Sequence, residues 1–238
     1  MKTKKIIKIV LGVVVFLTLP TLLFFGFLYF KYNEDLPIGT QPEQADVLAY
    51  KMLESLNYEA YKSTNYIEWT FKKRHHYKWQ KNKNICEVFW KNYKVELHLN
   101  HLELSKTYIG DTLIETKEAK ELQDKALNYF NNDSFWLIAP YKVFDNGTTR
   151  KIVDLPNKEQ GLLITYSSGG STPGDSYLWI LDENYKPKAF KMWVSILPIA
   201  GLEASWSDWT TTETGAQLPT FHNLLVLGLE MDDIKTAN

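Results

Sequence analysis

The chain has 238 residues, of which 45% are hydrophobic, with 27 basic and 28 acidic side chains and a single cysteine. A formal net charge of −1 argues against general nucleic-acid binding, and one cysteine excludes an internal disulfide framework. Eight tryptophans in a chain of this size indicate large apolar surfaces, either buried or concave.

The first 31 residues differ sharply from the rest. Four lysines within the first eight residues precede Ile9–Phe30, a run of 22 residues without a charge. At about 1.5 Å per residue this run makes a helix of roughly 33 Å, enough to cross a hydrocarbon core. An uncleaved anchor is favoured over a cleaved signal peptide, because the run is too long and no small-residue cleavage site follows it. We therefore interpret residues 1–31 as a cytoplasmic basic tip and transmembrane anchor, with membrane contact through residues 9–30.

The lysine bias places the N-terminus in the cytoplasm and everything after the anchor outside it. The expected localisation is the cell inner membrane, single-pass, with the C-terminal domain in the periplasm. Residues 32–43 hold two prolines and a glycine and are predicted to be a linker, which leaves 44–238 as one domain. Removing the four N-terminal lysines from the 27 basic residues leaves 23 against 28 acidic ones, a net charge of −5 that further disfavours nucleic acid.

The domain itself is predicted to be α+β. Apolar residues at helical spacing predict one helix from Pro42 to about Ser63 and a second over Glu115–Phe130. Alternating patterns predict about eleven strands, near 66–74, 76–80, 85–91, 94–100, 102–108, 148–154, 161–167, 176–182, 187–197, 202–212 and 221–230. Because helices do not alternate with strands, we expect a large, strongly curved antiparallel sheet with the helices on its concave face. The apolar stretch Phe135–Lys142 is interpreted as a connector that leads from the second helix through a turn at Pro140 back into the sheet.

Three segments, Asn132–Thr148, Asp175–Trp193 and Ala204–His222, resemble uncharacterised bacterial envelope proteins of the LolA/LolB-like superfamily of lipoprotein localisation factors. The order of the predicted helices and strands resembles that of these proteins from roughly Ala45 to Met231. The resemblance implies an incomplete antiparallel barrel of about eleven strands, with helices plugging the concave face and an apolar cavity between. The carriers of that superfamily hold lipoprotein acyl chains in the cavity. This chain has neither a cleaved signal nor a lipidated cysteine, so it is not expected to be a mobile carrier.

The aromatic content and the resemblance together predict a membrane-anchored envelope protein that binds a lipid, an acyl chain or a lipidated protein non-covalently in an apolar cavity. The residues expected to bind this ligand are Trp69, Trp136, Ile138, Trp179, Trp193 and Trp206. The alternative is a structural or protein-interaction module of the cell envelope whose barrel is filled by its own side chains.

No catalytic, cofactor-binding or metal-binding constellation is predicted, so the chain is not expected to be an enzyme. His98 and His101, with Glu96 and Glu103 nearby, come nearest to a metal-ligand set, but a solvated polar strand face explains them. The stretch Lys72–Lys83 carries six basic residues interleaved with aromatic rings. We interpret it as a charged hairpin that projects into water, with anionic lipid headgroups as the alternative.

Overall fold

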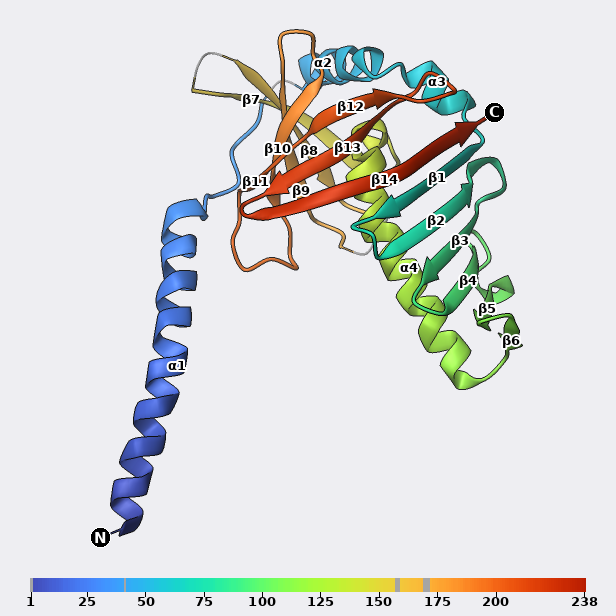
Figure 1. Cartoon of the computed structure of the whole chain (residues 1–238). Helices are drawn as coiled ribbons and strands as arrows, with labels where there is room; N and C mark the ends of the chain where they lie inside the picture. Colours follow the sequence, from blue (N-terminus) through green and yellow to red (C-terminus); the bar gives the residue numbers. More distant parts are fainter. Residues whose placement is uncertain (1, 41, 157–158, 169–171) are drawn as a thin grey trace.

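The computed structural model describes residues 2–40, 42–156, 159–168 and 172–238. A long N-terminal helix leads into a domain in which one antiparallel sheet curves around two helices (Figure 1). The helices are α1 (Lys2–Tyr32), α2 (Pro42–Ser55), α3 (Tyr58–Ser63) and α4 (Lys117–Ile138), with short 3-10 turns η1 (Lys81–Lys83), η2 (Leu102–Leu104) and η3 (Ala139–Lys142). The strands are β1 (Tyr66–Phe71), β2 (His75–Gln80), β3 (Ile85–Trp90), β4 (Tyr93–His98), β5 (Lys106–Ile109), β6 (Thr112–Ile114), β7 (Thr148–Asp154), β8 (Gln160–Tyr166), β9 (Ser176–Leu181), β10 (Pro187–Trp193), β11 (Leu202–Ser205), β12 (Ser207–Thr211), β13 (Gln217–Leu224) and β14 (Leu227–Ala237).

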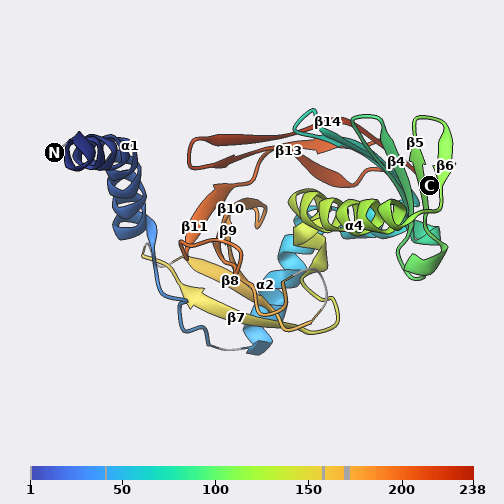
Figure 2. The ribbon, with the colours of Figure 1, turned by 90° about the horizontal axis from the view of Figure 1, so that it is seen from below.

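The sheet is open, as expected for an incomplete barrel. Its strand order is β6-β5-β4-β3-β2-β1-β14-β13-β11-β10-β9-β8-β7, with β12 paired to β13 off this path. α4 packs against β4, β5 and β13, while α2 packs against β7 and β8, so both helices lie within the curve of the sheet (Figure 2). This arrangement confirms the α+β class and the large antiparallel sheet.

The sheet has fourteen strands among the described residues, against about eleven predicted. One predicted strand, 202–212, is two strands separated at Trp206, and Asp208 has φ 54° beside this break. Another, 221–230, is a hairpin whose turn lies at Leu225, with φ 54°. The third addition is β6, a three-residue edge strand too short to give a periodic signal.

The helices also differ from their predicted bounds. The predicted helix from Pro42 to Ser63 is broken at Asn57, which adopts the left-handed conformation (φ 55°) and separates α2 from α3. α4 runs on through Phe135 to Ile138, so the stretch predicted as a connector is mostly helical. α4 ends at Ile138, and Pro140 lies inside the 3-10 turn η3 that follows it.

α1 is long and apolar enough to span a membrane from Lys4 to Tyr32, and its most apolar window is entirely unburied. Its C-terminal end is tied to the domain. The amide of Glu34 donates to the carbonyl of Ala200 (3.0 Å), and the side-chain oxygen of Asn33 accepts from the Ala200 amide (3.0 Å). Lys191 forms an ion pair with Glu34 (2.7 Å). The end of the apolar helix therefore lies against the loop between β10 and β11.

The antiparallel register gives the sheet two distinct ends. Phe71 at the end of β1 pairs with Met231, the fifth residue of β14, so the β13–β14 hairpin extends past the β1–β2 turn on the same side. His76 near the start of β2 pairs with Phe89 near the end of β3. Ala204, the third of the four residues of β11, pairs with Leu224 at the end of β13, so the start of β11 lies beyond the end of β13. We call the resulting common end, with its β1–β2, β3–β4 and β13–β14 turns and β10–β11 loop, the anchor-side end of the sheet, because α1 attaches there (Figure 1). The opposite end, which carries the β9–β10 and β12–β13 turns, is the distal end.

Candidate functional site

Three of the six predicted ligand-binding residues lie together inside the curved sheet. Trp179 and Trp206 are 0% and 1% exposed, and their rings meet edge to face with centroids 4.9 Å apart. Phe190 contacts both rings, at 5.1 and 5.5 Å. Trp136 on α4 packs on Phe190 at 5.4 Å. These distances are typical of well-packed aromatic pairs.

His222 connects this aromatic cluster to the backbone of two elements. Its ring meets that of Trp206 at 4.3 Å, and its nitrogens lie 2.8 Å from the carbonyl oxygen of Ser205 and 2.7 Å from that of Trp136. Burial lowers the pKa of His222 to about 4, and the two carbonyl groups offset part of that lowering. The imidazole is therefore neutral at physiological pH, and its single N–H donates to one of these two carbonyl oxygens at a time.

The other three predicted residues have different surroundings. Trp69 is buried beneath another part of the sheet, where it stacks on Tyr77 at 4.5 Å and lies near Phe130 of α4. Ile138 is a buried core residue at the end of α4. Trp193 packs against a separate small cluster of apolar residues, and its indole nitrogen donates to the carbonyl of Glu34 (2.8 Å). Five of the six residues thus belong to or pack against one continuous hydrophobic core, and Trp193 lies in a separate cluster.

Several polar atoms in this interior have no hydrogen-bond partner among the described residues. They are the indole nitrogens of Trp69, Trp79, Trp179 and Trp206 and the hydroxyl group of Tyr166. Buried polar groups in proteins are usually paired, so four unpaired indole N–H groups are unusual for a domain of this size.

A buried carboxylate lies at the contact between α4 and the sheet. Asp133 is 2% exposed and accepts from the hydroxyl of Tyr77 (2.6 Å) and, on the same oxygen, contacts Nδ1 of His75 (2.7 Å). Burial, and then the nearby carboxylate, raise the pKa of Tyr77 far above its ordinary value, so the phenol remains a donor. His75 also stacks on Tyr129 of α4 at 3.9 Å. This network positions His75 at the edge of a surface depression.

That depression, the basic depression, lies at the anchor-side end and has a volume of about 220 Å³. It is lined by Thr70, Lys73, Arg74, His75, His76, Phe89, Trp90 and Lys91, from the β1–β2 and β3–β4 hairpins. Lys73 forms an ion pair with Glu230 (3.1 Å), whereas neither Arg74 nor Lys91 has an acidic partner among the described residues. The site offers exposed cations beside an aromatic wall, which suits an anionic group. The sequence indicated the first hairpin but not the contribution of Lys91.

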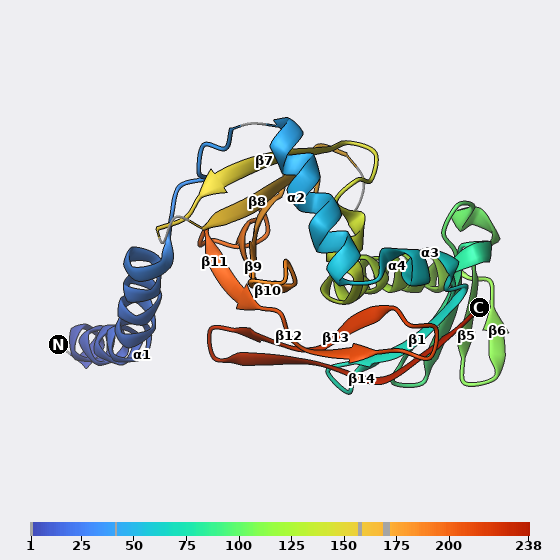
Figure 3. The same cartoon turned by 90° about the horizontal axis from the view of Figure 1, so that it is seen from above.

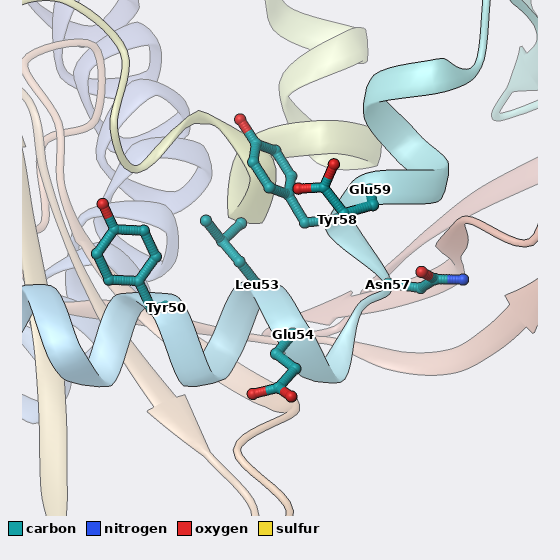
Figure 4. Close-up of a pocket in the computed structure, with 6 residues that line it drawn as sticks. All are labelled: Tyr50, Leu53, Glu54, Asn57, Tyr58 and Glu59. Atoms are coloured by element: carbon teal, nitrogen blue, oxygen red, sulfur yellow. The ribbon is translucent and has the colours of Figure 1, made fainter.

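A second depression, the elbow depression, lies between α2 and α3 and has a volume of about 340 Å³ (Figure 4). It is lined by Tyr50, Leu53, Glu54, Asn57, Tyr58 and Glu59. In the close-up the side chains of Tyr50, Leu53 and Tyr58 lie on one side of the helix, and Glu54 points to the other. The side-chain amide of Asn57 donates to the carbonyl of Gly215 (2.9 Å), which places the elbow at the distal end.

Sequence reasoning missed the elbow depression entirely. Its signal was Asn57, a residue that tolerates the left-handed conformation and disfavours a helix interior. Neither depression is lined by any of the six predicted residues.

The histidines singled out for metal binding form two separate pairs. His98 lies 3.1 Å from Glu96, and the more exposed His101 lies 3.3 Å from Glu103. Within the described ranges no group of three or more His, Cys, Asp or Glu side chains is placed to hold a metal ion. Comparison of the chain with protein-family models and with curated proteins finds no match.

Proposed function

We propose that this chain is a single-pass, membrane-anchored module of the cell envelope that acts by protein–protein contact and whose half-barrel is filled by its own side chains. The observation that carries the proposal is the aromatic cluster inside the sheet. Trp179, Trp206 and Phe190 interlock at 4.9–5.5 Å with no exposed ring surface to offer a ligand. Packing of this kind is typical of a core.

The proposed anchor is α1, which has the length and apolar composition of a spanning helix. The lysines at its N-terminal end favour insertion with that end in the cytoplasm. The domain then lies in the periplasm, held at the surface of the inner membrane. Neither catalysis nor a cofactor is part of the proposal.

The elbow depression is the proposed contact site for the partner protein. It lies at the distal end of the sheet, away from α1, where it is accessible in an anchored protein. Its lining combines the exposed ring of Tyr50 with the half-buried Tyr58 and the carboxylates of Glu54 and Glu59, of which Glu59 is already paired with Lys62 (2.8 Å). Tyrosine-rich surfaces of this chemistry suit a short segment that carries an apolar side chain and a basic residue.

Photo-crosslinking in intact cells tests this proposal. A photoreactive phenylalanine analogue at Tyr50 or Tyr58 is expected to give a discrete adduct of higher mass, and the same group at Tyr108, on β5 away from the elbow, is expected to give none. Adduct formation should fall when Glu54 is changed to Lys. Equal labelling at all three positions, or no adduct at the elbow, would contradict the proposal.

A second candidate function is the binding of a lipid, acyl chain or lipidated protein within the half-barrel. The unpaired indole N–H groups of Trp69, Trp79, Trp179 and Trp206 favour it, because polar atoms of a bound ligand would pair with them. The resemblance to LolA/LolB-like proteins also supports it. Native mass spectrometry of the full chain, released from detergent, separates the two functions. Co-purifying lipid, lost on changing Trp206 but not Trp193 to Leu, favours this second candidate, whereas a ligand-free chain that takes up no fluorescent fatty acid favours the filled module.

A further inference from the structure

We propose that the anchor-side end of the sheet rests on the bilayer surface, with the β13–β14 turn inserted among the lipids and the basic depression over anionic phosphate headgroups. This inference rests on the proposed anchoring by α1. It goes further, because an anchored domain on a linker could equally stand away from the membrane.

The β13–β14 turn is the most exposed apolar feature of the domain. Val226 is 94% exposed, and its neighbours Leu225 and Leu227 are 40% and 52% exposed. Beside this hairpin, the β10–β11 loop presents Ile196, which is 67% exposed. Turns in water normally carry Gly, Asn, Asp or Ser, so three consecutive bulky apolar residues at a turn indicate a surface that meets an apolar medium.

The position of α1 identifies that medium as the bilayer. Hydrogen bonds of Asn33 and Glu34 to Ala200 hold the end of α1 against the same loop that presents Ile196. In Figures 1 and 3 the β13–β14 turn lies on the side of the domain next to α1. Since α1 leaves the membrane at this point, the apolar turn is close to the membrane surface from the start.

The charges of the same end fit the headgroups of anionic lipids. Lys72, Arg74 and Lys91 lie in the β1–β2 and β3–β4 turns and have no acidic partner among the described side chains. The acidic residues nearby are Glu230, which is paired with Lys73, Asp233, which accepts a hydrogen bond from Thr70 (2.9 Å), and Asp232, which lies near Lys73. Basic residues within a Debye length of an anionic leaflet are attracted to it, and the aromatic wall of the depression suits the interfacial region.

The geometry is compatible with an ordinary spanning helix. The turns that carry these residues lie along one edge of the sheet, which slopes away from the end of α1 in Figure 1. Spanning helices are tilted by about 20° on average, so α1 need not stand along the membrane normal when these turns approach the surface.

Depth measurement by electron paramagnetic resonance tests the inference in the full chain reconstituted into nanodiscs of phosphatidylglycerol and phosphatidylcholine. A nitroxide is attached at Val226→Cys, and a matched one at Glu183→Cys in the distal β9–β10 turn. Cys86 is fully buried and burial raises the pKa of its thiol, so the introduced cysteine is labelled selectively. At position 226 we expect collisions with oxygen to exceed those with a water-soluble nickel chelate several-fold, and the reverse at position 183.

Nickel accessibility at position 226 equal to that at 183 would overturn the inference. Carbonate extraction then shows which part of the proposal has failed. If the chain stays in the membrane after carbonate treatment, only the surface contact is refuted. If carbonate releases the chain, the anchoring by α1 is refuted as well. In a second arm, the label at 226 is compared in nanodiscs with and without phosphatidylglycerol. The nitroxide at position 226 should lie deeper in the bilayer when phosphatidylglycerol is present. The triple change of Lys72, Arg74 and Lys91 to Gln should abolish this difference in depth between the two kinds of nanodisc. An unchanged response in the triple variant would remove the headgroup contact from the proposal.

Discussion

Replacing Trp206 by Ala distinguishes a filled half-barrel from an open one. The Trp206 ring is 1% exposed and contacts Trp179, Phe190 and His222 at 4.3–5.5 Å. Each such aromatic pair contributes about 0.5–1.5 kcal/mol beyond its buried area, and removing a packed tryptophan costs about 3–5 kcal/mol in total. With three ring partners lost at once, we expect the free energy of unfolding to fall by about 4 kcal/mol.

The assay is urea unfolding of the full chain in detergent micelles, followed by the fluorescence of the remaining tryptophans. Trp193→Ala is the matched control, because Trp193 packs at the periphery and its indole makes one hydrogen bond, to the carbonyl of Glu34. Loss of that bond and of partial burial should cost about 1–2 kcal/mol. A ring that bordered an open cavity would have few contacts to lose. Equal costs for the two variants would therefore refute the filled interior.

Three further predictions follow from single contacts. Tyr141→Phe removes a buried hydroxyl that lies 2.9 Å from the carbonyl of Leu56 and 2.6 Å from that of Gln217, so the urea midpoint should fall by the equivalent of about 1–2 kcal/mol without change in slope. Asp133→Ala leaves the Tyr77 hydroxyl without its acceptor and should cost about 3 kcal/mol in the same assay, whereas Asp133→Asn, which retains an acceptor, should cost less. The folded-state pKa of His222, about 4, lies below the unfolded value of about 6.5. Its contribution is therefore complete above pH 6.5 and is lost as the pH falls toward 4, by about 1.4 kcal/mol per unit. This slope should be absent in His222→Gln and should therefore appear in the difference in stability between wild type and that variant.

Regular periodicity accounts for the parts of the fold that the sequence predicted. The pattern of Tyr66–Phe71 gave a strand because one face of β1 is buried and the other is not. The apolar run of α1 was recognised because a helix that is apolar all round has no other common interpretation at that length. α4 was found from its amphipathic stripe, but its last turns were missed because Phe135–Ile138 are surrounded by sheet and helix and show no polar face.

The candidate sites could not be predicted in the same way, since each depends on residues brought together by pairing across the sheet. Arg74 and Lys91 are distant in sequence and meet only because β2 and β3 are neighbours. Conversely, composition grouped Trp69 and Trp193 with the other tryptophans, although one is buried beneath a different part of the sheet and the other packs in a separate cluster. Residue type indicated burial correctly but carried no information about which rings share a space.

The β13–β14 turn was missed for a reason that bears on function. Local rules predict a continuous strand over 221–230 because its turn-type residues, Asn223 and Gly228, are separated by four apolar residues. The chain nevertheless reverses there, with Leu225 at φ 54°, a conformation that costs a non-glycine residue about 1–2 kcal/mol. Val226 then stands almost fully exposed. This turn has two unfavourable features in water, the left-handed backbone of Leu225 and the exposed apolar side chain of Val226. Contact with a lipid surface beside α1 would remove the Val226 side chain from water and so offset the cost of its exposure. The conflict between local propensity and observed structure is thus greatest at the point where we place the membrane contact.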